Sequence, residues 1–386
     1  MSSKIKWHIG RIVLLAVMII MVGAAAFGCI SGISPIGWSG GAVSDNTIYV
    51  GSREGRLVAL NLNDDSRQWA NKITNAATTS FLSCGSSTGG GCSSASTGVA
   101  IYGTPVVSGN LVYIAGYNGK IYAYTTGTLS ERWVYPRDSY LQPFVGGLVI
   151  DGGKLYIGCA DGKVYAFDAA TGDKLWEFAT GAKIWATPAI SGGTLYIGSF
   201  DKKLYALDTT TGKEKWEQPF ETQGANMATP LVYNGIVYFG SLDRNLYAVN
   251  AADGVLKWNI TGENWFWSEP VIVNNMIYAG CLDGNVYILK ADTGEKVAVI
   301  NLNSGIASKP VIVDESIIFA TKKGLIYSVN TVSNQAAQLA DLKLEVDGPL
   351  TAYQGIIYLQ TQDIALQRIN AASGAVLPPI SLKGQN

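Results

Sequence analysis

A unit of about forty residues recurs along most of the chain, and this repetition constrains the fold more than any other feature. The two clearest copies span residues 185–216 and 227–258. Each contains a Thr-Pro segment, a tyrosine-bearing apolar run, a tight turn, a second apolar run and a tryptophan. Further copies end at Trp176, begin at Trp267, and lie at 38–69, 102–133, 307–339 and 347–380, which makes eight in all.

Each copy predicts four short strands. Alternation such as Leu195-Tyr196-Ile197-Gly198 indicates a half-buried strand, and turns such as Asp161-Gly162 and Asp283-Gly284 favour a hairpin. A single four-stranded unit cannot bury both of its faces, but a ring of such units can. A linear solenoid is the alternative, yet the end copies carry no polar cap. We therefore predict an all-β fold, an eight-bladed β-propeller of four-stranded antiparallel blades over residues 38–380, with outer-strand tryptophans wedged between blades.

Charge and histidine content exclude several functions. The chain carries 28 Lys and Arg against 29 Asp and Glu, which argues against a nucleic-acid partner. Its one histidine, His8, precedes the repeats. Histidine-based triads, His-ligated metals and haem attachment are therefore excluded from the repeats, and we expect no metal site.

Residues 1–29 have the pattern of a secretory signal or membrane anchor. A basic start (Lys4, Lys6 and Arg11) precedes an apolar run over 12–28, which ends at Cys29. The last residues resemble the lipobox of bacterial lipoproteins, which makes Cys29 a lipidation candidate. An uncleaved anchor helix and ordinary cleavage near the alanines stay open. All three predict an extracytoplasmic protein, joined through a short linker, 30–37, to the propeller.

The five cysteines fall into different settings. Cys84 and Cys92 lie in a Ser-, Thr- and Gly-rich insertion over residues 71–100, and in an exported protein they predict a local disulfide. The insertion is either a pinned recognition loop or a decorated surface loop. Cys159 and Cys281 share one repeat position that holds small residues in other copies, so we interpret it as a tight packing site.

The recurring pattern LYxG…DG.LYALD..TG...W resembles the tryptophan-docking repeat of the pyrroloquinoline quinone (PQQ) propellers over roughly residues 38–380. That superfamily includes PQQ-dependent alcohol dehydrogenases and non-catalytic propellers such as the outer-membrane-protein assembly lipoprotein of the Bam complex. The dehydrogenases carry two adjacent cysteines and calcium ligands, whereas no two cysteines are adjacent here. The resemblance therefore implies a scaffold that is not an enzyme and has no cofactor, with PQQ and calcium only under the alternative.

Aromatic residues near the start of the repeats are the candidate binding surface. Most stand three residues before the position that opens the first strand of a copy, so a ring should gather them near one mouth of the channel. The candidates are Trp38, Tyr102, Trp185, Met227, Trp265, Phe266 and Trp267. Exposed aromatics anchor peptides well, and packing between blades is the alternative explanation. We predict a monomeric envelope scaffold that binds a protein or peptide; the alternatives are a PQQ-dependent dehydrogenase-like quinoprotein and a propeller that binds a sugar or another small ligand.

Overall fold

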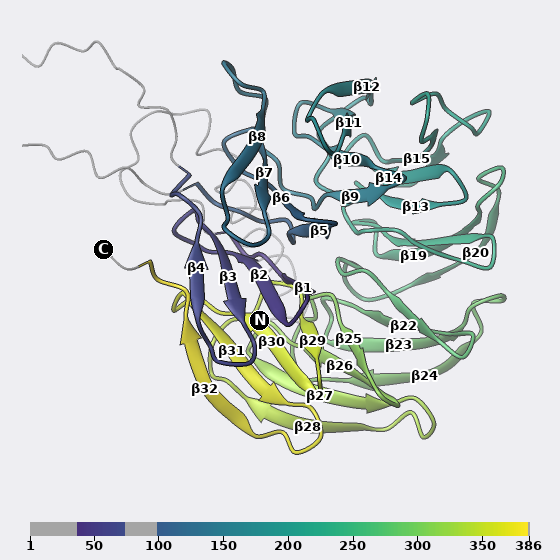
Figure 1. Ribbon diagram of the computed structural model, residues 1–386. Helices are drawn as coiled ribbons and strands as arrows, with labels where there is room; N and C mark the ends of the chain where they lie inside the picture. Colours follow the sequence, from purple (N-terminus) through teal and green to yellow (C-terminus); the bar gives the residue numbers. More distant parts are fainter. Residues whose placement is uncertain (1–36, 74–98, 385–386) are drawn as a thin grey trace, which may run out of the picture. The chain divides into compact units, whose positions relative to one another are not determined.

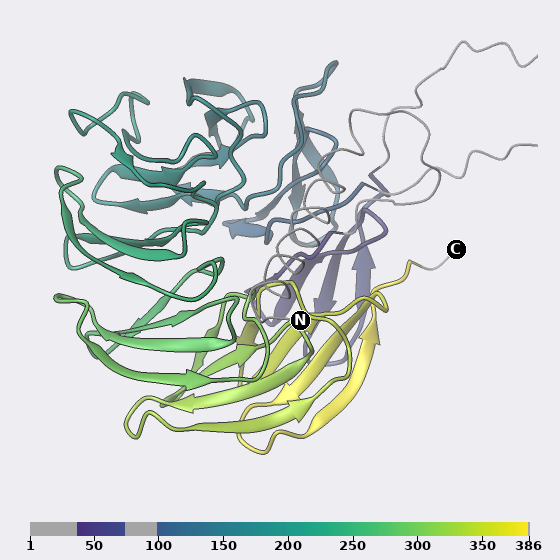
Figure 2. The ribbon, with the colours of Figure 1, turned by 180° about the vertical axis from the view of Figure 1, so that it is seen from behind.

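Strands that follow one another along the chain form each sheet, as the repeats predict. The computed structural model describes residues 37–73 and 99–384, and these residues fold into eight four-stranded antiparallel sheets set around a central axis (Figures 1 and 2). The first strand of each sheet lies next to the axis and the fourth lies at the rim (Figure 1). Within the described ranges, no helix is long and apolar enough to span a bilayer. The predicted eight-bladed propeller is confirmed.

The strands are short. The first four blades comprise β1 (Gly41–Ser44), β2 (Thr47–Gly51), β3 (Leu57–Asn61), β4 (Arg67–Trp69); β5 (Val106–Ser108), β6 (Leu111–Ala115), β7 (Ile121–Thr125), β8 (Glu131–Tyr135); β9 (Val149–Asp151), β10 (Lys154–Gly158), β11 (Lys163–Asp168), β12 (Lys174–Ala179); and β13 (Ala189–Ser191), β14 (Thr194–Gly198), β15 (Lys203–Asp208), β16 (Phe220–Glu221). The other four comprise β17 (Leu231–Tyr233), β18 (Ile236–Gly240), β19 (Asn245–Asn250), β20 (Leu256–Thr261); β21 (Val271–Val273), β22 (Met276–Gly280), β23 (Asn285–Lys290), β24 (Lys296–Asn301); β25 (Val311–Val313), β26 (Ser316–Ala320), β27 (Leu325–Asn330), β28 (Ala336–Asp341); and β29 (Thr351–Tyr353), β30 (Ile356–Gln360), β31 (Ala365–Asn370), β32 (Val376–Ser381).

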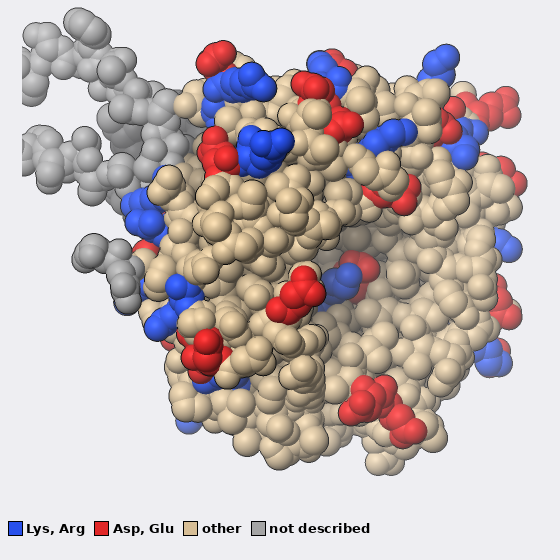
Figure 3. All heavy atoms as spheres, viewed as in Figure 1, with Lys and Arg blue, Asp and Glu red and all other residues tan. Residues whose placement is uncertain are grey.

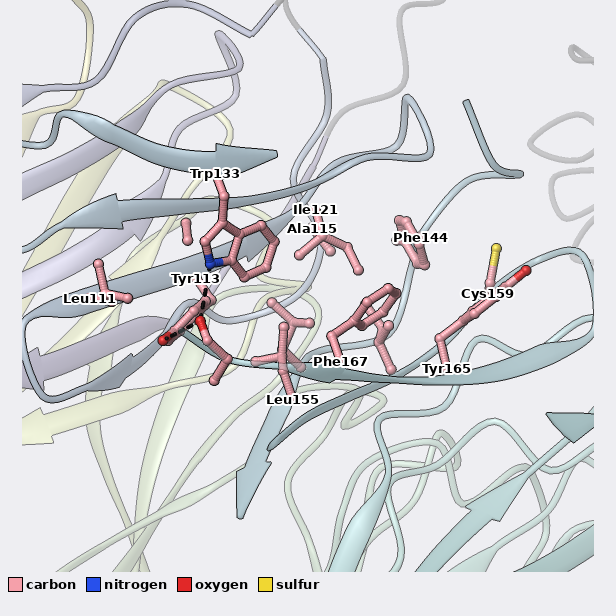
Figure 4. Packing of buried hydrophobic residues seen from close by; sticks show 14 residues of the cluster. Leu111, Tyr113, Ala115, Ile121, Trp133, Phe144, Leu155, Cys159, Tyr165 and Phe167 are labelled. Carbon is pink, nitrogen blue, oxygen red and sulfur yellow. Dashed lines mark hydrogen bonds between the residues drawn. The ribbon is translucent and has the colours of Figure 1, made fainter. Parts of the chain in front are cut away.

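The tryptophan of an outer strand joins its blade to the next one. Trp133 of β8 donates its indole N–H to the Ala169 carbonyl at 3.0 Å, and Tyr113 of β6 donates its hydroxyl to the same oxygen at 3.0 Å (Figure 4). Trp176, Trp216 and Trp258 repeat this contact with Thr209, Ala251 and Ala291. For these four blades the predicted wedge between blades is confirmed.

Trp69 departs from this pattern. A register shift in β7, β11 and β19 places their tryptophans opposite Ala123, Ala166 and Ala248. Blade 1 lacks this shift, so Trp69 pairs with Val58 and lies on the other face of its sheet. There it packs with Leu366 and Ile380 of the last blade, and its buried indole nitrogen has no hydrogen-bond partner. Trp69 therefore also lies between two blades, as predicted, but it packs against the last blade and not against the second.

Side-chain contacts close the ring between the first and last blades. Thr351 Oγ1 accepts from the Gly41 N–H at 3.0 Å and donates to the Gly41 carbonyl at 2.8 Å. At the rim, Arg368 and Asp65 form an ion pair at 3.0 Å. The strands of both blades are consecutive in sequence, so the ring closes without strand exchange. This settles the order of closure, which the repeats alone leave open.

Candidate partner-binding face

One end of the propeller carries the longer loops. In each antiparallel meander, the turn between the second and third strands lies at the same end as the connection to the next blade, and the other two turns lie at the opposite end. We call the first end the loop face; it comprises these connections and second turns. All seven candidate residues belong to connections that precede β1, β5, β13, β17 and β21, so they lie at this end.

Trp38 and Tyr102 form one aromatic cluster on the loop face. Their ring centroids lie 4.7 Å apart in an edge-on arrangement, and Tyr117 lies 5.5 Å from Tyr102. Burial raises the pKa of Tyr102 above its ordinary value, so the ring stays neutral. Trp38 is half-buried, whereas Tyr102 is buried. Tyr117 is half-buried as well, so the exposed part of this cluster belongs to Trp38 and Tyr117.

Trp185 belongs to a second cluster on the fourth blade. Its ring lies 4.9 Å from that of Phe200 in an edge-on arrangement, and Lys183 Nζ lies 4.5 Å from both ring centroids. Burial lowers the pKa of Lys183. Lys183, Phe200 and Tyr117 were not predicted from the sequence, although Phe200 and Tyr117 occupy the same repeat position, two residues after β14 and β6. A cation over two aromatic rings gives this cluster both an apolar and a charged component.

The remaining candidates divide by exposure. Trp265 and Trp267 are half-buried, and Met227 is buried, with 9% of its surface exposed. Phe266 is only 1% exposed and packs 5.2 Å from Tyr287 in the core between the fifth and sixth blades. Its candidacy as a partner contact is therefore wrong, because it offers no surface. The other candidates, Met227 included, are distributed around the loop face on blades 1, 2, 4, 5 and 6, and do not gather at a single spot.

Carboxylates at the second turns fix the loops that carry these aromatics. Asp201 accepts hydrogen bonds from the Tyr205 hydroxyl and from the Gly181 N–H, both at 2.7 Å. Asp243 and Asp283 hold the preceding connections in the same way. Each of these three acids thus accepts hydrogen bonds from a tyrosine of the strand that follows its turn and from a backbone N–H of the connection before its blade. Across residues 37–73 and 99–384, no group of three His, Cys, Asp or Glu is placed to hold a metal ion.

The tyrosines beside the second-turn aspartates should make the folded protein less stable in alkali. Burial, together with the adjacent aspartate, raises the pKa of the hydroxyls of Tyr165, Tyr205, Tyr247 and Tyr287. An unfolded tyrosine ionises near pH 10. The contribution of these neutral hydroxyls to the free energy of unfolding is therefore complete below that pH and falls as the pH rises further. The urea midpoint should hold from pH 8 to 9.5 and drop steeply by pH 11, with a smaller drop in Tyr205→Phe. A midpoint unchanged at pH 11 would contradict this.

The described cysteines pack as small buried groups. Cys159 and Cys281 are free, fully buried thiols, and burial raises the pKa of each. Their Sγ atoms donate to the carbonyls of Gln142 at 3.2 Å and Asn264 at 3.3 Å. Cys29, Cys84 and Cys92 lie outside the described residues, so lipidation and the local disulfide stay predictions. The described ends of the insertion meet in a backbone hydrogen bond from Val99 to Ile73.

Consecutive four-stranded meanders, tryptophan docking and closure at eight blades define this chain as a propeller of the PQQ-like repeat class. The family model of the outer membrane protein assembly factor BamB matches residues 31–184 and 160–377. The chain belongs to this family.

Two solved structures share the fold. The computationally designed Ika8 protein superposes with a TM-score of 0.69 at 16% identity, over 87% of this chain and 96% of its own. BamB from Moraxella catarrhalis superposes with a TM-score of 0.65 at 20% identity, over 83% of this chain and 92% of its own. A search of curated proteins found no match.

Proposed function

We propose that this chain is a non-catalytic scaffold of the cell envelope that binds a protein or peptide partner through its loop face. The observation that carries the proposal is the cluster of Trp185, Phe200 and Lys183, in which a half-buried indole stands on a loop that Asp201 holds in place. Rigid, partly exposed aromatics beside a cation are typical anchors of protein interfaces. Because the loop is ordered before binding, little conformational entropy is lost on contact.

Family membership supports the finer proposal that the partner takes part in outer membrane protein assembly. The matching family is described as an assembly factor, and a propeller with anchors distributed over several blades suits a role in holding another protein. We further propose that the N-terminal segment exports the chain and attaches it to the membrane, through lipidation of Cys29 or through an uncleaved helix. The loop face would then operate within the envelope.

The proposal includes the absence of a PQQ cofactor. No two cysteines of the chain are adjacent, and the described carboxylates of the second turns are engaged with tyrosine hydroxyls and backbone N–H groups. We therefore expect titration with PQQ and calcium, up to high micromolar concentration, to leave tryptophan fluorescence and calorimetric heat unchanged. Saturable, calcium-dependent binding would favour the quinoprotein alternative instead.

Crosslinking of the full-length chain in its native envelope tests the partner. The proposal predicts that a crosslinker placed on the loop face captures one protein in reproducible yield. If loop-face positions capture nothing above background, the scaffold proposal fails whatever the result of the PQQ titration.

A further inference from the structure

The central channel contains one ion pair that the repeat pattern does not explain. Lys309 Nζ lies 2.8 Å from Glu269 Oε2, and both residues stand immediately before the proline that opens an inner strand. The corresponding positions of the other six blades are uncharged: Gly40, Thr104, Gly147, Thr187, Thr229 and Pro349. Opposite charges therefore occur here on two adjacent blades, the sixth and seventh, and nowhere else in this register.

The pair borders a cavity of about 430 Å³ that opens on the channel. The inner strands β17, β21, β25 and β29 line it, and its wall is mainly apolar, with Val232, Ile272 and Ile312 among its residues. Ile312 is 47% exposed although it belongs to an inner strand. The space-filling view is hollowed near the centre of the ring, with charged side chains of both signs inside (Figure 3). The volume lies within the range of small-molecule sites.

The hydrogen-bonding capacity of the pair is largely unused. The Glu269 side chain is 16% exposed, and its described polar contact is the one with Lys309, although a carboxylate has about four acceptor sites. Burial raises the pKa of Glu269, while Lys309 opposes that shift. The Lys309 side chain is 48% exposed and keeps donors for a further acceptor. Pro270 and Pro310 restrict the backbone of the residues before them, so the two side chains start from fixed positions.

We propose that this cavity binds a free α-amino acid with an apolar side chain. The two protein charges lie close together, so a ligand that bonds to both would carry opposite charges a short distance apart, as the α-ammonium and α-carboxylate on one carbon of an amino acid do. The ammonium would bond to Glu269 and the carboxylate to Lys309, while the side chain packs against Ile272 and Ile312. The termini of a longer peptide are too far apart to satisfy both charges. Glu269 and Lys309 stand at the ends of loop-face connections, but the site shares no residue with the aromatic clusters and does not depend on a partner protein.

Calorimetric titration of the full-length protein tests the proposal with four probes. L-phenylalanine and L-leucine should bind saturably. Phenethylamine and 3-phenylpropionate each lack one of the two charges and should bind about tenfold more weakly or worse, since each loses a charged hydrogen bond. Absence of binding by both amino acids at millimolar concentration overturns the proposal, as does equal affinity for the singly charged probes.

Paired substitutions locate the site. Glu269→Gln combined with Lys309→Gln removes both charges and leaves no buried charge unpaired, and it should weaken phenylalanine binding at least about tenfold. The control replaces an exposed ion pair of the third blade, Lys174→Gln with Glu177→Gln, and should bind as the native chain does. Ile312→Asp alters an already exposed side chain and should also weaken binding, which covers the case in which the double variant fails to fold. Native affinity in a folded double variant or in Ile312→Asp overturns the assignment.

Discussion

Replacing Trp133 with alanine is expected to lower the free energy of unfolding by about 3–5 kcal/mol. The indole is 7% exposed, fills the space between the second and third blades and donates to the Ala169 carbonyl (Figure 4). Alanine leaves a cavity there and removes one of the two donors to that oxygen. Urea denaturation followed by fluorescence and circular dichroism measures the change. Trp69→Phe provides a comparison: it keeps an aromatic ring and removes an indole nitrogen that has no partner, so the loss should stay under about 1 kcal/mol.

The same contact can be tested from the other blade. A Cβ built on Gly172 would lie 2.6 Å from the Trp133 ring, and Gly172 has a φ of 77°. Gly172→Ala should therefore be strongly destabilising. Gly127 occupies the corresponding turn of the second blade, has no atom within 4 Å of a built Cβ, and should accept alanine with little change. Equal stability of the two glycine variants would mean that tryptophan docking does not hold the blades together as described.

Trp185→Ala is expected to weaken the complex with the envelope partner by about 2 kcal/mol, or roughly thirtyfold. The substitution removes the exposed part of the cluster and leaves Lys183 and Phe200 without their shared neighbour. Affinity can be measured by binding of the purified chain to solubilised partner once crosslinking has identified it. The control is Val255→Ala, which changes a 61% exposed side chain at the opposite end of the propeller and should not alter affinity. A native affinity for Trp185→Ala would exclude this cluster as an anchor.

The repeats predicted the architecture because each blade repeats the same local signals. The spacing of turns, tyrosines and tryptophans determined the number of blades and the order of strands. Trp69 was the exception, because it stands as far from Ala59 as Trp133 stands from Ala123. Only the hydrogen-bonded register distinguishes them: one strand pair contains a bulge and the other does not. A bulge moves a side chain to the other face without changing the residue count.

The candidate site was predictable in its location but less so in its details. Repeat position placed the aromatics at one end of the propeller, yet it did not indicate which of three consecutive aromatics points inward. Phe266 lies in the core while Trp265 and Trp267 remain half-buried, as the alternation of an extended segment would give. Lys183 and Trp185 contact Phe200 only because the fold brings the connection before the fourth blade next to that blade's second turn. The ion pair of Glu269 and Lys309 was missed because its members belong to different repeats and become neighbours only when the blades are placed side by side.

Photo-crosslinking in intact cells tests the central claim most directly. Benzoylphenylalanine would replace Trp185 on the loop face in one strain and Val255 at the opposite end in another. A scaffold that binds through its loop face predicts a discrete protein adduct from position 185, absent without irradiation, and no adduct from position 255. If position 185 and the equivalent positions Trp38 and Trp267 yield no adduct, or if position 255 yields the same one, the loop face is not the binding surface and the proposed function is wrong.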